Sequence, residues 1–153
     1  MPDQNAVLDA IVTRAQGLGL LADGAPVPIV KRKQPKRRQD DPPLLIVVCP
    51  SQRPDEIRRW TNIHDRFLYF STVAVIGRNR DDQLTSLPEH TALRDALKDA
   101  FKVKPADLMG LDNLRDVRAT GGRLFDRALA KAGYDFQSVE VTVDIVEDRR
   151  GGP

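Results

Sequence analysis

The most distinctive chemistry in this chain comes from a short basic run. Six of the eight side chains in residues 31–38 are cationic, and none is acidic. Positive charge at this density fits the phosphates of a nucleic acid or an acidic protein surface. The alternatives are a solvated loop, and a loop that pairs with acids on a neighbouring copy of the chain. The residues predicted to make these contacts are Lys31, Arg32, Lys33, Lys36, Arg37 and Arg38.

A second basic cluster contains the single tryptophan of the chain. Arg53, Arg58 and Arg59 lie within a few residues of Trp60. Arginine and tryptophan are both enriched among the residues that contribute most to protein interfaces. The cluster therefore predicts interface anchors at Arg58, Arg59 and Trp60. The alternative is an ordinary surface on which arginine stems cover a half-buried tryptophan.

No residues in the sequence have the spacing of a catalytic, cofactor or metal site. His64 and His90 have no second histidine or cysteine at ligand spacing. We expect His64 in a polar turn and His90 on the surface of a helix. Cys49 is expected to pack in the core, and Asp81 and Asp82 to lie in a solvated turn. The sequence predicts a non-enzymatic protein, since an enzyme would need carboxylates or histidines from separate segments to converge in a cleft.

The composition predicts one soluble domain. The chain has 153 residues and a formal net charge of +2. We expect a single domain over residues 1–147 and a flexible tail over residues 148–153. The single cysteine is typical of a reducing compartment. Because the start resembles no secretion signal and the apolar runs are far shorter than the roughly 20 residues of a membrane helix, we expect an intracellular protein without membrane contact.

The periodicity of apolar residues predicts the elements that carry these side chains. Grouped strands without regular strand–helix alternation indicate an α+β fold, with a single layer of mainly antiparallel sheet and helices packed on one face. The segment 57–64 fits either a helix or a polar strand. Helices are predicted over residues 6–16, 88–102 and 124–132, and strands over residues 27–32, 44–49, 67–77, 114–119 and 139–147.

The order of these elements resembles that of a known family. The resemblance rests on the first helix, the strand with its basic exit at residues 27–33, and the proline-bounded apolar run at residues 42–50. It continues through the strand at residues 67–77 with its charged turn at residues 78–82, the helix at residues 88–102, and the turn at residues 133–136 with the strand that follows it. In these features the chain is similar to the tail terminator or tail-completion (head–tail joining) proteins of long-tailed bacteriophages.

The resemblance implies a structural virion subunit, assembled in the host cytoplasm. Such α+β subunits form a six-fold ring that ends the tail tube and docks the head or neck. The implied partners are other copies of the chain, the tail tube and neck or connector proteins. Ring assembly is heterologous, so the basic run could meet acids of the next copy, such as Asp81, Asp82, Asp144, Glu147 or Asp148. The alternative is a basic module that contacts DNA phosphates non-specifically.

Overall fold

A computed structural model describes residues 3–22, 24–59, 61, 63–78, 87–102, 111, 113–124 and 126–148. A six-stranded sheet organises the chain, in the order β3-β4-β6-β8-β7, with β5 paired to β6. Only β3 and β4 pair in parallel among the described strands, so the α+β class with a mainly antiparallel sheet is confirmed. The strands are β3 (Ile29–Lys31), β4 (Leu44–Pro50), β5 (Glu56–Arg59), β6 (His64–Arg78), β7 (Leu114–Gly121) and β8 (Tyr134–Asp148).

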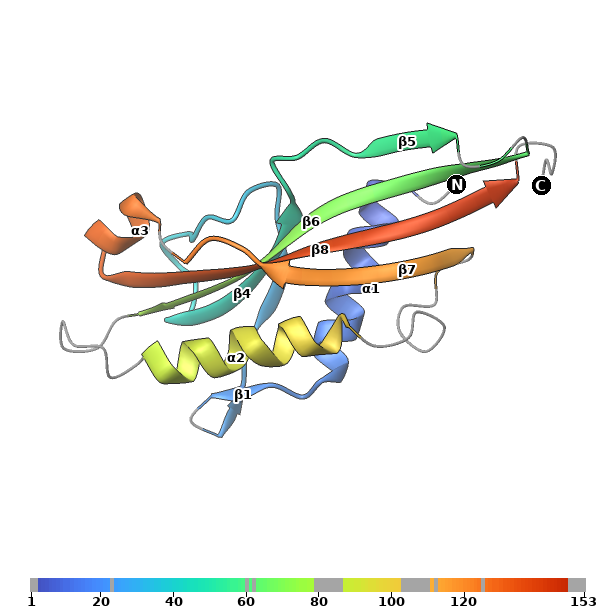
Figure 1. Cartoon of the computed structure of the whole chain (residues 1–153). Helices are drawn as coiled ribbons and strands as arrows, with labels where there is room; N and C mark the ends of the chain where they lie inside the picture. Colours follow the sequence, from blue (N-terminus) through green and yellow to red (C-terminus); the bar gives the residue numbers. More distant parts are fainter. Residues whose placement is uncertain are drawn as a thin grey trace.

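Strands β6 and β8 pair with each other at the centre of the sheet (Figure 1). Each strand has 15 residues, and their register runs without a break from His64 opposite Asp148 to Arg78 opposite Tyr134. Both are longer than predicted, because the backbone hydrogen bonds between them continue past the residues that show regular apolar alternation. Asp148, which we assigned to the flexible tail, is the last residue of β8. The rest of that tail lies outside the described residues.

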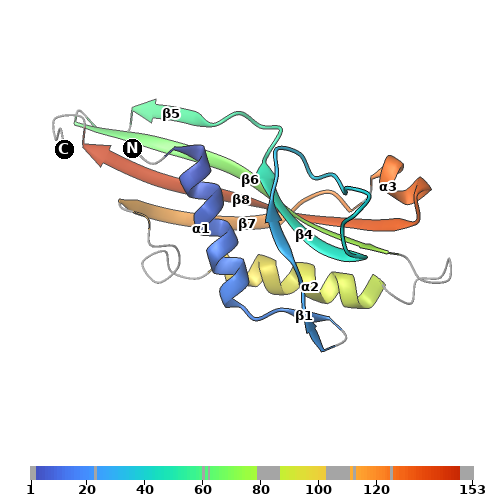
Figure 2. The ribbon, with the colours of Figure 1, turned by 180° about the vertical axis from the view of Figure 1, so that it is seen from behind.

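Two long helices cover one face of the sheet (Figure 2). Helix α1 (Gln4–Gly17) begins where the Asp3 carboxylate accepts a hydrogen bond from the backbone N–H of Ala6, and Gly19 follows its end at φ 62°. Helix α2 (Leu87–Ala100) packs on the same face, against β6, β7 and β8. A short hairpin, β1 (Leu21–Ala22) and β2 (Ala25–Pro26), leads from α1 to the sheet. The main core between helices and sheet includes Val7, Ile11, Leu97, Phe101, Val73, Val141 and Ile145.

The opposite face has a second, smaller apolar core around β4. Its buried residues come from alternate positions of β4 and β6, which point away from α1 and α2, and from the start of β8. The third helix, α3 (Arg127–Lys131), supplies Leu129 to this core and is the exception to our expectation of helices on one face. We call this region the covered half. It contains Leu45, Val47, Cys49, Ala74, Ile76 and Phe136.

The same face continues beyond this core as a distal arm. We define the arm as β5, residues 64–72 of β6, residues 114–118 of β7 and residues 140–148 of β8. In Figures 1 and 2 these strands run on past α3, with α1 and α2 on the other side of the sheet. No helix of the described chain lies on this face of the arm. Polar side chains there can therefore face solvent or a partner protein.

Candidate interaction surfaces

The basic run lies in the crossover loop, residues 32–43, which joins β3 to β4. Parallel neighbours cannot be joined by a tight turn, so the chain must return from the end of β3 to the start of β4. Arg32 and Asp41 tie the two ends of this loop together. Arg32 Nη1 donates to Asp41 Oδ2 at 2.5 Å, and Nη2 donates to Oδ1 at 2.6 Å. Arg32 Nη1 also donates to the carbonyl of Lys36 at 3.0 Å, so one guanidinium fixes the shape of the loop.

Solvent has little access to this ion pair. Only 11% of the Arg32 side chain and 9% of the Asp41 side chain are exposed. The hydrogen bonds from Arg32 lower the pKa of Asp41 to about 2, although burial acts in the opposite direction. The backbone N–H of Arg38 also donates to Asp41 Oδ2, at 2.6 Å. The same pairing raises the pKa of Arg32, so both groups are charged across the physiological range.

Two more residues of the basic run are also engaged within the chain. The Arg37 guanidinium lies over the ring of Tyr134, 4.3 Å from its centroid, and donates to the carbonyl of Asp41 at 2.6 Å. Lys31 Nζ donates to Asn5 Oδ1 at 2.5 Å and forms an ion pair with Asp9 at 2.6 Å, both on α1. The contact with Tyr134, at the edge of the second core, anchors the crossover loop over the covered half.

The remaining cations of the run point outward. Lys33, Lys36 and Arg38 are exposed, and within the described ranges no carboxylate pairs with their side chains. The structure thus divides the predicted site in two. Lys31, Arg32 and Arg37 hold the loop to the body, whereas Lys33, Lys36 and Arg38 form an outward-facing set that we call the exposed cations.

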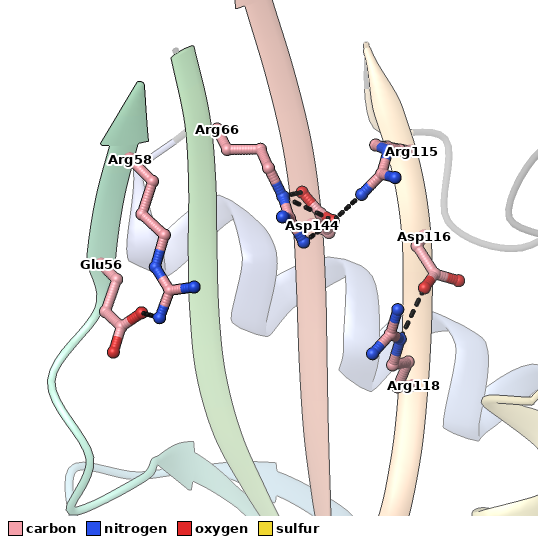
Figure 3. Close-up of polar contacts among 7 residues, drawn as sticks. All are labelled: Glu56, Arg58, Arg66, Arg115, Asp116, Arg118 and Asp144. Atoms are coloured by element: carbon pink, nitrogen blue, oxygen red, sulfur yellow. Dashed lines mark hydrogen bonds and ion pairs between the residues drawn. The ribbon is translucent and has the colours of Figure 1, made fainter. Parts of the chain in front are cut away.

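The distal arm carries a different charge pattern, centred on Asp144 (Figure 3). Arg66 donates from Nε and Nη2 to this carboxylate at 2.8–3.2 Å, and Arg115 Nη1 donates at 2.8 Å. Only 4% of Asp144 is exposed, because the two guanidiniums cover it from β6 and β7. Asp144 therefore connects three strands, and its own arginines enclose the carboxylate that we named among the candidate acids for the basic run of the next copy.

Both outer strands of the arm repeat one small motif (Figure 3). On β5, Arg58 forms an ion pair with Glu56 at 2.5 Å. On β7, Arg118 forms an ion pair with Asp116 at 2.7 Å. In each case the partners are two residues apart and lie on the same face of one strand. The residue between the β5 partners, Ile57, is 68% exposed and points to the other face.

The two predicted surfaces are not brought together. Arg58 and Arg59 are exposed on β5, at the edge of the distal arm, whereas the crossover loop lies on the covered half. Arg58, which pairs with Glu56, lies on an edge strand. The residue type alone did not predict that position. Trp60 lies outside the described residues, as do Asp81 and Asp82. Among the described residues, the exposed side chains of this surface are those of Arg58, Arg59 and Ile57.

No protein-family model matches the chain, and no curated protein matches it in sequence. A chain from a solved structure described as "Virion of native gene transfer agent (GTA) particle" is similar in fold, with a TM-score of 0.49 and 16% sequence identity. The match covers 93% of this chain and 86% of that chain.

The histidine expected on the surface is buried, so that prediction was wrong. His90 is 4% exposed, and its Nδ1 lies 3.1 Å from Asp135 Oδ2 on β8. Gly77 makes room for the ring, since a Cβ there would lie 2.3 Å from the imidazole. A glycine in a strand that faces a helix was the available signal for such a close approach. His64 lies at the start of β6, with Nδ1 2.9 Å from Thr61 Oγ1.

The other candidates for chemistry have structural roles or lack partners for catalysis. Cys49 is buried, as predicted, and burial raises the pKa of its thiol to about 12, which removes it as a nucleophile near neutral pH. No group of three or more potential metal ligands occurs in the part of the chain that the structure describes. None of the described helices is long and apolar enough to cross a membrane.

Proposed function

We propose that this chain is a structural subunit of a phage-like particle that assembles as a ring. The ring ends the tail tube and docks the head or neck, and six is the copy number that the sequence resemblance implies. The observation that carries the proposal is the distal arm, whose two outer strands, β5 and β7, have an unpaired side within the described chain. A heterologous ring needs two different surfaces on each subunit, and two different strand edges meet that requirement.

The charges of the molecule support contacts with other proteins. The Arg66–Asp144–Arg115 cluster stiffens the charged part of a face that no described helix covers, and the exposed cations lie on a loop that is already fixed by Arg32 and Asp41. A surface that is rigid before binding loses less conformational entropy when it binds. On this proposal the exposed cations contact the tube, a neck protein or the DNA that passes through the ring.

Native mass spectrometry over a range of protein concentrations tests the ring directly. We expect a closed species with one defined copy number, and a ring with a central opening in negative-stain images. A protein that remains a monomer at every concentration, and in the presence of phage-like tail tubes, would contradict the proposal.

The exposed cations favour a second candidate function, a module that binds nucleic acid phosphates. Lys33, Lys36 and Arg38 have no acidic partner among the described residues and could each neutralise a phosphate. The test is a salt titration of binding to random-sequence duplex DNA. This candidate predicts that Lys36→Glu with Arg38→Glu abolishes binding. Lys98→Glu with Lys102→Glu makes an equal charge change in α2 and just after its end, and should not abolish binding. No binding by the unmodified protein at low salt removes this candidate.

A further inference from the structure

We propose that β5 of one copy pairs with β7 of the next copy, antiparallel, in one specific register. In this register Glu56 lies opposite Arg118, Ile57 opposite Val117, and Arg58 opposite Asp116. The inference rests on the proposed ring and names the contact that would close it. The occupant of each free strand edge is therefore a second copy of this chain.

Strand direction is the first support. From β5 through β6 and β8 to β7, every neighbour in the distal arm is antiparallel. The outermost strands β5 and β7 therefore run in opposite directions. When the next copy has the same orientation, its β5 lies antiparallel to β7, and the alternation continues from copy to copy. Repetition around a ring leaves no open edge on the arm, which removes the aggregation hazard of exposed strand edges.

Matching of the two faces is the second support. On β5, Glu56 and Arg58 share the charged face with Arg66, and Ile57 points to the helix-bearing face. On β7, Asp116 and Arg118 share the charged face with Asp144, and Val117 packs into the main core. A continuous sheet keeps its faces, so charged residues meet charged residues and Ile57 meets the strand of Val117. The contact brings Ile57, a large aliphatic side chain that is 68% exposed on an edge strand, beside β7 of the next copy.

The charge order is the third support, and it selects the register. Glu56-Ile57-Arg58 and Asp116-Val117-Arg118 have the same pattern of acid, aliphatic residue and arginine. Antiparallel pairing reverses one of them, so each acid lies opposite an arginine. A shift of two residues in one direction puts Glu56 opposite Asp116, and a shift in the other puts Arg58 opposite Arg118. Like charges directly opposite each other are destabilising, so both neighbouring registers are disfavoured.

The register also gives the stagger that a closed sheet requires. Within one copy, Glu56 pairs with Leu68, Leu68 with Asp144, and Asp144 with Asp116, so Glu56 lies level with Asp116. In the proposed contact, Glu56 of the next copy lies opposite Arg118, which is two residues further along β7. Each copy is thus displaced along the strands relative to the last, and closed sheets depend on such a displacement.

A composition-neutral exchange tests the contact. Glu56→Arg with Arg58→Glu reverses the order on β5, keeps a charge pair within the strand, and places like charges opposite both β7 residues. We expect self-association to weaken by about tenfold or more, since two attractive pairs become repulsive. Adding Asp116→Arg with Arg118→Asp should restore it. Thermal unfolding of each variant at low concentration checks that the fold is kept.

The exchange also separates this contact from a two-fold dimer of β5 strands. In such a dimer Glu56 lies opposite Arg58 of the partner copy, and reversal leaves that pairing attractive. Unchanged association of the β5 exchange variant would therefore overturn the β5–β7 contact. If that variant still forms rings of normal size, the edge contact is wrong and the proposed ring survives.

Disulfide trapping tests the register and remains informative if the free protein associates weakly. Arg58→Cys with Asp116→Cys places the new thiols directly opposite each other, within the reach of a disulfide. Oxidation should give a ladder of crosslinked copies whose upper limit is the ring size. Arg58→Cys with Thr120→Cys, four residues out of register, should not crosslink. Equal crosslinking of both variants, or of neither, would overturn the proposal, and neither crosslinks nor rings would also contradict the proposed function.

Discussion

The covered half and the distal arm lie on the same face of the same sheet and are stabilised in different ways. In the covered half, alternate residues of β4 and β6 are apolar and fully buried beneath the crossover loop and α3. In the distal arm, the same face carries arginines and carboxylates that pair with one another across strands, beside two buried apolar residues of β6, Leu68 and Phe70. Burial of apolar area stabilises the first region, and directional ion pairs fix the second. The difference indicates that the covered half is complete within one copy, whereas the charged side chains of the distal arm are accessible to a partner.

Truncation of an apolar side chain should have the largest effect, and only in the covered half. Ile76 is fully buried in the second core, so Ile76→Ala should lower the free energy of unfolding by about 3 kcal/mol. Ile57→Ala makes the same chemical change at a side chain that is 68% exposed, and should cost less than about 0.5 kcal/mol in the monomer. Urea unfolding at low protein concentration measures both values. Similar losses at the two positions would contradict the distinction between the regions.

Removal of the central carboxylate should have the next largest effect. Asp144→Ala leaves Arg66 and Arg115 facing each other without the acid, and should cost about 2 kcal/mol of unfolding free energy. Asp99→Ala is the control, because that side chain is 78% exposed and only 3.9 Å from Lys102. Its cost should stay below about 0.5 kcal/mol. Equal effects would mean that the distal arm does not depend on Asp144.

The contribution of the crossover loop to the free energy of unfolding should depend on pH. The pKa of Asp41 is lower in the folded protein, about 2, than its ordinary value of 3.8. Its contribution to stability is therefore complete above pH 3.8 and is lost as the pH falls through 2. Asp41→Asn should cost about 1–2 kcal/mol at neutral pH, and the difference from the unmodified protein should shrink below pH 4. A difference that stays constant between pH 5 and 2 would rule out ionised Asp41 as the cause.

The rate of thiol labelling should differ between the two regions, and its measurement requires no substitution in the apolar core. Cys49 is fully buried in the covered half, and the pKa of its thiol is raised to about 12. We expect a maleimide reagent to label it only as fast as the protein unfolds. A cysteine introduced by Arg118→Cys, at a side chain that is 71% exposed, should react at once in the monomer and slowly in an assembled ring. Rapid labelling of native Cys49 would show that the covered half opens independently.

Apolar periodicity was sufficient to predict the long strands and the two long helices, because alternate residues such as Val139, Val141, Val143 and Ile145 are buried. It left residues 57–64 open between a helix and a strand, and β5 lies there because its charged residues carry no apolar pattern. Charge density was sufficient to locate the crossover loop. The division of that loop into engaged and exposed cations was not predictable, because it depends on Asp41 and on Tyr134, nearly a hundred positions further along the chain. The burial of Asp144 by two arginines was not predictable for the same reason. Its arginines lie 78 and 29 residues away in sequence, and no local pattern connects them.

The long pairing of β6 with β8 also has a consequence for biosynthesis. The first residue of β6, His64, pairs with the last residue of β8, Asp148, and α2 and β7 lie between them in sequence. Pairing over such a separation makes folding slow, because a large loop must close before the contacts form. During synthesis β6 leaves the ribosome before its central partner exists. The arm that we propose for assembly is therefore completed only after β8 has emerged, so that subunits fold before their edges can join.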